Sequence, residues 1–182
     1  MLYGRDFRAV AERLLKGHRF TPSQNDYDWL GQGIYFWEYG FDRAMQFARD
    51  QKKRGKVKKP AVVGALLQLG RCFDLMDTWF TRKLARGYEP WAAAMKAQKT
   101  KLPTNDGVTR DKLLRRLDCA VINWYLAGAA EAGLQYESVR CGFVEGTPVY
   151  EGTQIHQQSH VQIAVRNPRC VIGVFRPMME EP

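Results

Sequence analysis

Two glycines spaced two residues apart precede a short run of bulky residues that could hold a flat ligand. Gly31 and Gly33 come just before Tyr35, and glycine lets the backbone approach a ligand closely. An aromatic ring on a rigid strand can stack on a flat heterocycle. The same spacing also fits a turn that enters a core strand, with Tyr35 as a buried aromatic. The residues alone therefore indicate either a heterocycle-binding strand or a structural turn.

A second set of polar side chains lies toward the C-terminal end of the chain. His160 and Gln162 are two residues apart, so on a strand their side chains share one face. His156 and His160 have i,i+4 spacing, but the strand-like pattern and the lack of a nearby carboxylate argue against a zinc site. Glu151 could supply a carboxylate to this set. The alternative for His160 is a surface or core histidine without a role in any site.

The segment DWLGQGIYFWEYGFDRAMQFA, residues 28–48, resembles the G-x-G-[IV]-Y-F segment of the poly(ADP-ribose) polymerase-like ADP-ribosyltransferases. The likeness is to a bacterial, diphtheria-toxin-like branch of that superfamily, and it covers roughly residues 1–50 and 138–176. In the family this segment opens the NAD pocket. The resemblance implies that Tyr35 stacks on the nicotinamide and that Phe47 closes the other side of the ring. We expect Trp29 and Trp37 to be packing residues.

The family also has a histidine–glycine step on its first strand. Gly4 matches the glycine that clamps the nicotinamide amide, whereas Tyr3 stands where the family usually has histidine. The ribose contact is therefore the Tyr3 hydroxyl, a different residue, or absent, and residues 2–3 could also be only a fraying strand. The resemblance assigns cofactor binding to Gly4, Ser23, Gly33, Tyr35, Phe36, Phe47 and His160.

The third family position is a late glutamate, which Gln162 replaces in a segment that ends at Asn167-Pro168. The resemblance makes Tyr35, Gln162 and Tyr3 the catalytic residues. Glutamine keeps a hydrogen-bond acceptor for the ribose 2′-hydroxyl, but it lacks the charge that would stabilise the positive charge developing on the ribose. This implies mono-ADP-ribosylation without chain elongation. NAD is the implied substrate, and no metal is implied, because the leaving group is already a cationic pyridinium.

The net charge of +9 is concentrated in two segments. Residues 51–59 hold six basic and no acidic side chains, and residues 81–116 hold ten basic and three acidic ones. Such segments are typical of a footprint for phosphates, and aromatics interleaved with the second one favour nucleic acid. The alternative is a solvated, solubilising face. The predicted nucleic-acid contacts are Lys52, Lys53, Arg54, Lys56, Lys58, Lys59, Arg115 and Arg116.

We expect one α+β domain over residues 1–182, with an ADP-ribosyltransferase-like split β-sheet core and a basic helical insertion at about 73–130. Apolar spacing predicts helices at 6–16, 41–51, 109–117 and 119–130, and a helical region over 73–101 interrupted at Gly87 and Pro90. Apolar runs between turn residues predict strands at 34–37, 61–69, 138–144, 161–165 and 170–175. The basic run 51–59 is expected to be a loop.

Four separated cysteines form no CxxC pair, which favours reduced thiols and a cytoplasmic protein. The absence of 18 consecutive apolar residues argues against a membrane partner. The sequence thus predicts an NAD-dependent mono-ADP-ribosyltransferase acting on RNA or DNA, of a size that fits a toxin or defence effector. The alternatives are a protein-directed toxin that docks an acidic partner such as an antitoxin, an NAD hydrolase, and an inactive NAD- or nucleic-acid-binding module.

Overall fold

The structure, a computed structural model, describes residues 6–107 and 113–178 of the 182-residue chain. The α-helices in these ranges are α1 (Phe7–Leu15), α2 (Phe41–Lys53), α3 (Thr78–Ala97) and α4 (Arg116–Glu131). The strands are β1 (Ile34–Trp37), β2 (Gly64–Leu67), β3 (Cys72–Asp74), β4 (Asn105–Asp106), β5 (Leu114–Arg115), β6 (Ser138–Phe143), β7 (His160–Val165) and β8 (Val171–Phe175). A short 3₁₀ turn, η1 (Pro168–Cys170), precedes β8.

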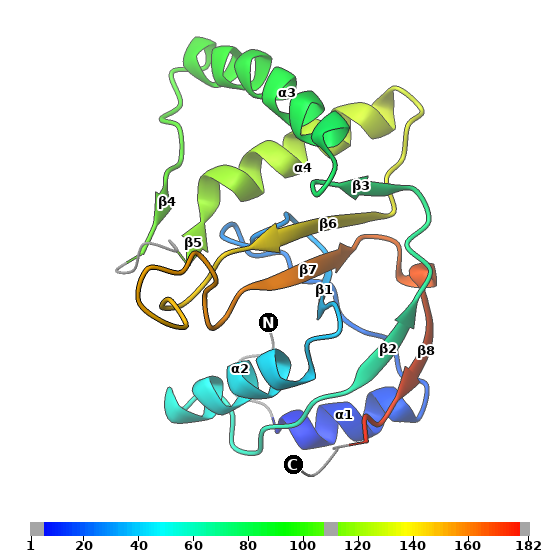
Figure 1. The fold of residues 1–182 in the computed structure, drawn as a ribbon. Coiled ribbons are helices and arrows are strands. Elements are labelled where there is room, and N and C mark those ends of the chain that lie inside the picture. The colour runs from blue at the N-terminus through cyan, green and yellow to red at the C-terminus, as the bar shows by residue number, and fades with distance from the viewer. Residues whose placement is uncertain (1–5, 108–112, 179–182) are drawn as a thin grey trace.

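A mixed sheet in the strand order β1-β7-β6-β3 forms the centre of the molecule. β7 pairs antiparallel with β1 and β6, whereas β3 pairs parallel with β6. β2 and β8 form a separate antiparallel ribbon, and β4 pairs with β5. Figure 1 shows α3 and α4 at one end of the molecule, and α1, α2 and the β2–β8 ribbon at the other. The predicted α+β class is confirmed.

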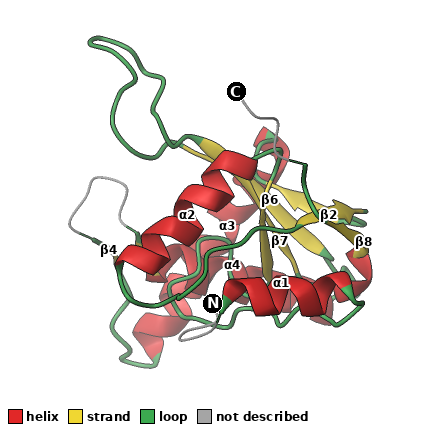
Figure 2. Ribbon diagram, turned by 90° about the horizontal axis from the view of Figure 1, so that it is seen from below, coloured by secondary structure: helices red, strands yellow, loops and turns green. Residues whose placement is uncertain are grey.

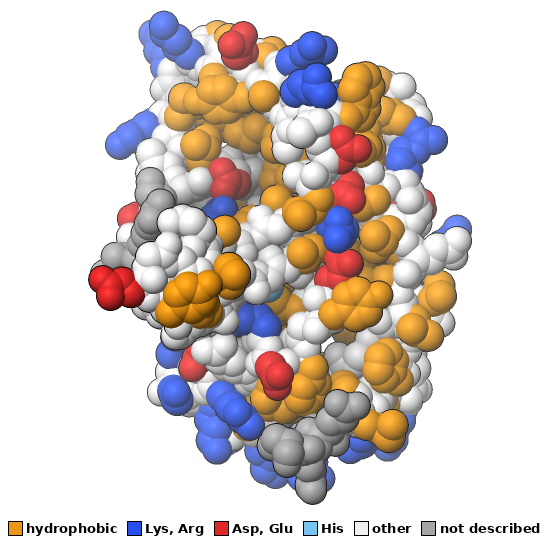
Figure 3. Space-filling view, in the orientation of Figure 1, with side chains coloured by type: hydrophobic (Ala, Val, Ile, Leu, Met, Phe, Trp, Pro, Cys, Tyr) orange, Lys and Arg blue, Asp and Glu red, His pale blue; other side chains and the backbone are white. Residues whose placement is uncertain are grey.

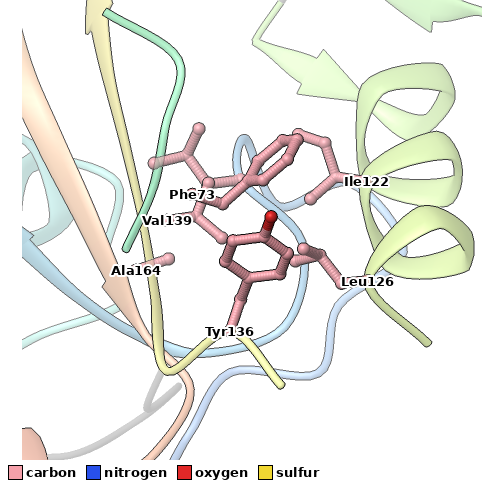
Figure 4. Close-up of a cluster of buried hydrophobic side chains, with 7 residues drawn as sticks. Phe73, Ile122, Leu126, Tyr136, Val139 and Ala164 are labelled. Carbon is pink, nitrogen blue, oxygen red and sulfur yellow. The ribbon is translucent and has the colours of Figure 1, made fainter. Parts of the chain in front are cut away.

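The main core lies between α4 and the central sheet. Figure 4 shows Ile122 and Leu126 of α4 facing Phe73 of β3 and Val139 of β6. Phe73 and Val139 are completely buried. Residues 116–131, which fall in the predicted basic insertion, therefore supply one wall of the core.

The opposite face of the sheet carries a second apolar cluster, because side chains alternate between faces along a strand. Ile34 of β1 packs there with Ile163 and Val165 of β7, and Phe20 and Phe36 border the cluster. Both faces of the central sheet are thus packed against apolar side chains. This double packing fixes the register in which β1 and β7 pair, since a slip by one residue would move every side chain to the wrong face.

Parts of two predicted helices are strands, because these residues pair with other strands of the chain. Residues 73–74 were expected to begin a helix, but Phe73 pairs with Val139 as part of β3. Residues 114–115 were also expected to be helical, but they form β5, and residues 108–112 lie outside the described ranges. Neither strand has a local periodicity that distinguishes it, because each is only two or three residues long.

The expected interruption of α3 is also wrong. The helix continues through Gly87 and the exposed Pro90. A Cβ at position 87 would lie 2.5 Å from the Tyr125 ring of α4. Gly87 is therefore a close-packing position for two helices and does not end α3. Asp77 starts this helix by accepting a hydrogen bond from Trp79 N at 2.8 Å.

Two further boundaries differ from the prediction. Lys52 and Lys53 extend α2, so the basic run 51–59 is a loop only from Arg54 onward. The predicted buried strand 61–69 is limited to β2, and Leu66 is 58% exposed. β2 is half-covered because its only described partner is β8, in a ribbon outside the central sheet.

The loop 144–159 joins β6 to β7 and extends away from the sheet (Figure 2). Its two ends return to neighbouring positions at the sheet, because Phe143 pairs with His160. No helix in the described ranges is long and apolar enough to cross a lipid bilayer.

Candidate functional site

The two segments that carry the predicted chemistry lie side by side. β1 pairs with β7 so that Trp37 is opposite Gln162 and Tyr35 is opposite Ala164. Directly opposed residues of an antiparallel pair point to the same face. Tyr35, Trp37, Gln162 and His160 therefore share the face that α4 covers further along the sheet. The end of this face, at Trp37 and Gln162, is the candidate site.

Tyr35 is fixed to the glycine turn by its hydroxyl. The hydroxyl donates to Gly31 O at 2.6 Å and accepts from Leu30 N at 2.8 Å. The ring packs against the main core, and burial raises the pKa of the phenol well above its usual value. Tyr35 thus has a structural role, because its hydroxyl holds the backbone of the glycine turn in place. Its predicted stacking on nicotinamide stays a prediction.

Protein packing leaves little room for a side chain at either glycine of the turn. Gly31 has a φ of +76°, and a Cβ there would lie 2.5 Å from Asn123 Oδ1. A Cβ on Gly33 would lie 3.0 Å from Val165 O. Ser23 pairs with Gly33 through two backbone hydrogen bonds of 2.7 and 3.1 Å. The predicted cofactor residues Ser23 and Gly33 therefore hold the entry to β1 against its neighbours.

A buried polar chain runs beside Trp37. The Gln162 amide donates to His160 Nε2 at 2.8 Å. On the other side of the imidazole, His160 Nδ1 lies 2.6 Å from Gln158 O and 3.5 Å from Glu145 Oε2. Arg43 of α2 donates to the same Glu145 oxygen at 2.7 Å. The side chains of His160 and Glu145 are 3% and 8% exposed, so this chain is held almost out of water.

Glu145 was missed by the sequence analysis, which considered Glu151 as the carboxylate. Glu151 is exposed in the loop 144–159. Glu145 reaches His160 because it follows β6 directly, beside the Phe143–His160 pair of the sheet. Only the pairing of β6 with β7 indicates that Glu145 lies near His160, and that pairing is not visible in the sequence. Arg43 had a weaker signal, since it lies one helical turn before the predicted Phe47 and so on the same side of α2.

Aromatic rings surround this polar chain. The rings of Trp29 and Phe143 lie 5.9 and 5.8 Å from the His160 ring, and Trp37 lies 6.3 Å from it. Phe47 packs on Trp37 with ring centroids 5.2 Å apart. Two walls that hold a ring between them need about 7 Å, twice a van der Waals contact. Trp37 and Phe47 therefore form a single wall of the site.

Two hydrogen-bond donors in this wall lack an acceptor among the described residues. They are Trp37 Nε1 and Arg43 Nε, and both atoms are buried. A buried donor without a partner costs about 1–3 kcal/mol. The Arg43 guanidinium also lies 5.6 Å from the centre of the Trp37 ring, so the two side chains that carry these donors pack against each other. Both donors lie in the interior beside the aromatic rings, and a carbonyl oxygen that reached them would be the matching acceptor.

Three other predicted site residues are not placed at this site. Phe36 points to the opposite face of the sheet, where its ring lies 5.4 Å from Phe20. It does not share a face with Gln162, because successive side chains on a strand alternate, and its predicted cofactor contact stays a prediction. Tyr3 and Gly4 lie outside the described residues.

The predicted nucleic-acid residues fall into two groups. Lys52, Lys53 and the residues to Lys59 are at the end of α2 and in the loop that follows, and most are exposed. Figure 3 shows Lys and Arg side chains gathered at the two ends of this face of the molecule. Arg115 is instead part of the candidate site, with its guanidinium 4.1 Å from the Trp29 ring. Arg116 pairs with Asp26 at 3.3 Å.

A surface groove of about 620 Å³ lies away from this site, between α1, η1 and β8. Leu14, Phe20 and Val171 contribute to its lining. In the described ranges no three His, Cys, Asp or Glu side chains come together in a way that would hold a metal ion. The candidate site is therefore defined by its hydrogen bonds and aromatic contacts.

Comparison with known proteins gives one partial similarity. A 77-residue stretch is 35% identical to the uncharacterized protein MJ0359 of Methanocaldococcus jannaschii, and the match covers 41% of this chain and 36% of that protein. No protein-family model and no solved structure matches the chain. The chain is thus similar to part of an archaeal protein over less than half of either length.

Proposed function

We propose that this chain is an NAD-dependent mono-ADP-ribosyltransferase with an ADP-ribosyltransferase-like split sheet, and that its acceptor is nucleic acid. The observation that carries the proposal is the pairing of β1 with β7, which brings Trp37 opposite Gln162. This pairing puts aromatic surface and a buried amide at one corner of the sheet. Nicotinamide riboside presents matching chemistry, namely a flat cationic ring, a carboxamide and ribose hydroxyls.

The donors without acceptors support the fit to nicotinamide. A carboxamide oxygen that reached Trp37 Nε1 or Arg43 Nε would accept a hydrogen bond and so satisfy a buried donor. A cationic pyridinium also gains from contact with an indole face. The wall formed by Trp37 and Phe47 thus takes the place that the sequence analysis gave to Tyr35 and Phe47.

The reaction breaks the bond between C1′ of the ribose and the pyridinium nitrogen. Nicotinamide leaves with the bonding electrons, and the ribose carbon develops positive charge. A hydroxyl or amine of the acceptor then attacks C1′ and loses its proton. Gln162 would accept a hydrogen bond from the 2′-hydroxyl and so orient the ribose. Because the amide has no charge, its stabilisation of the ribose cation is weaker than that of a carboxylate, which favours a single transfer.

The position of the basic run supports a nucleic-acid acceptor. Arg43 and Lys53 are ten residues apart on α2, a separation of about 15 Å at 1.5 Å per residue. A few nucleotides span that distance. A strand held by the exposed lysines at the end of α2 would therefore reach the candidate site. Charge of this kind contributes salt-dependent affinity without selecting a base.

The test incubates the purified chain with labelled NAD and with RNA, DNA or cell lysate. We expect labelled product that nuclease destroys and protease does not. Label removed by protease would instead favour a protein-directed transferase, and free nicotinamide without transfer would indicate a hydrolase. Binding of NAD without turnover would favour the inactive binding module. This module is the second candidate, because the Tyr35 hydroxyl bonds the protein backbone.

Charge-reversal variants test the acceptor separately. Replacing Lys52, Lys53 and Arg54 by Glu is expected to lower transfer to nucleic acid but not nicotinamide release. Replacing the exposed Arg8, Lys16 and Arg19 by Glu, on α1 and just after it, is the matched control, because these residues lie outside both basic segments. Equal loss of transfer in both sets would contradict a specific role for the run after α2.

A further inference from the structure

The direction of the Gln162 amide follows from the partners of His160. A backbone carbonyl can only accept a hydrogen bond. Because His160 Nδ1 lies 2.6 Å from Gln158 O, Nδ1 must carry a proton. The nearby Glu145 carboxylate, 3.5 Å from Nδ1, favours the same arrangement. In a neutral imidazole the second nitrogen, Nε2, is then an acceptor.

An acceptor at Nε2 fixes which end of the amide faces it. Only the NH₂ group of Gln162 can donate to Nε2 across 2.8 Å. The amide oxygen Oε1 must therefore point away from the imidazole. The hydrogen bond that this side chain makes among the described residues runs from its NH₂ group to His160, and Gln162 is 8% exposed. The Gln162 oxygen, as an acceptor for a ribose hydroxyl, is thus held in a single direction.

We propose that neutral His160 is a positioning residue, which holds the Gln162 amide with its oxygen toward the substrate and releases that hold when it is protonated. The inference rests on the proposed function and specifies its regulation. It concerns the direction of one amide, and that direction can be measured without any substrate.

Protonation would reverse the amide. A proton on Nε2 makes both ring nitrogens donors, so the NH₂ group of Gln162 would face another N–H. Rotation of the amide by half a turn removes this clash and brings Oε1 to Nε2. The NH₂ group would then face the substrate, where it cannot accept from the 2′-hydroxyl. Acidification is therefore expected to lower turnover.

The charges around His160 come from three elements. Burial is the largest influence and lowers the pKa of His160 below its usual value, whereas the Gln158 carbonyl and Glu145 raise it. Arg43 on α2 and Arg115 on β5 lower it further. The indole of Trp29 and the ring of Phe143 add no charge. Burial therefore favours the neutral imidazole, which is the form that the amide direction requires.

Nitrogen NMR of the histidine rings tests the arrangement in the free protein. The chain has three histidines, so a His160→Phe sample assigns the signal. At pH 7.5 we expect His160 protonated on Nδ1 and bare on Nε2. A ring protonated on Nε2 at that pH would overturn the proposal. In Gln162→Glu, a carboxylate beside Nε2 should raise the pKa of His160; an unchanged titration would count against the 2.8 Å contact.

The pH profile of turnover tests the consequence. In the wild type we expect kcat to fall on acidification with an apparent pKa below 6.5, the model-peptide value of histidine. His160→Phe should lower kcat about twofold to tenfold, the worth of one hydrogen bond, leave KM for NAD nearly unchanged, and lose the acidic fall. His156→Phe is the matched control, because His156 also contacts a carbonyl two residues back, Gln154 O at 3.0 Å.

The two arms separate this inference from the proposed function. Retention of the acidic fall in His160→Phe, with normal thermal unfolding, would overturn the positioning role. A protein that never releases nicotinamide would refute the transferase, while the NMR result would still decide whether His160 fixes the amide.

Discussion

Replacement of Tyr35 by Phe is expected to destabilise the fold through the glycine turn. The change removes one oxygen and keeps the ring in the core. Leu30 N, whose residue is 1% exposed, loses its acceptor, and Gly31 O loses its donor. Each buried backbone group left without a partner costs about 1–3 kcal/mol, and some of that cost is relieved by relaxation. We expect a loss of about 2–4 kcal/mol in the free energy of unfolding.

Denaturant and thermal unfolding measure this loss. For a domain of this size, each kcal/mol lowers the melting temperature by about 2–4 °C, so the expected drop is between about 4 and 16 °C. Tyr150→Phe is the matched control, because Tyr150 is 65% exposed and should change stability by less than about 0.5 kcal/mol. If Tyr35→Phe were no more destabilising than this control, the structural role of the hydroxyl would be refuted.

Three further predictions concern stability. Gly31→Ala should cost about 1–3 kcal/mol more than Gly17→Ala, since both residues have positive φ but only a Cβ at 31 meets Asn123; equal losses in chemical denaturation would contradict this. Leu126→Ala should cost about 2–5 kcal/mol, because Leu126 is 3% exposed in the main core, and a smaller loss would mean a looser core. Burial raises the pKa of Tyr35 above 10.0, so stability should fall above about pH 10 as the unfolded chain ionises. Tyr35→Phe should flatten that alkaline fall, and unfolding followed by pH would show it.

The elements nearest the site could be predicted from the sequence. β1 and β7 are runs of bulky or β-branched residues between turn residues, and the structure places them within one residue of the expected bounds. Their adjacency was implied only by the family resemblance. The pairing of Trp37 with Gln162 confirms that the two segments are neighbours.

Features that depend on long-range packing could not be predicted. β3 is a strand because it pairs with β6 some 65 residues later, and its three residues have no period of their own. Gly87 and Pro90 are local signals for a break, yet the tight packing of α3 on Tyr125 keeps the helix intact. Glu145 and Arg43 belong to segments that meet only in three dimensions. A charge pair of this kind leaves no pattern along the chain.

Release of nicotinamide from NAD in the presence of RNA tests the central claim most directly. The measurement compares the wild type with Gln162→Ala and with Gln68→Ala, an exposed glutamine beside β2. We expect release by the wild type, an equal rate for Gln68→Ala, and a rate lower by about tenfold for Gln162→Ala, the worth of one hydrogen bond. A folded wild type that releases no nicotinamide, or a Gln162→Ala variant that releases it at the wild-type rate, would contradict the account.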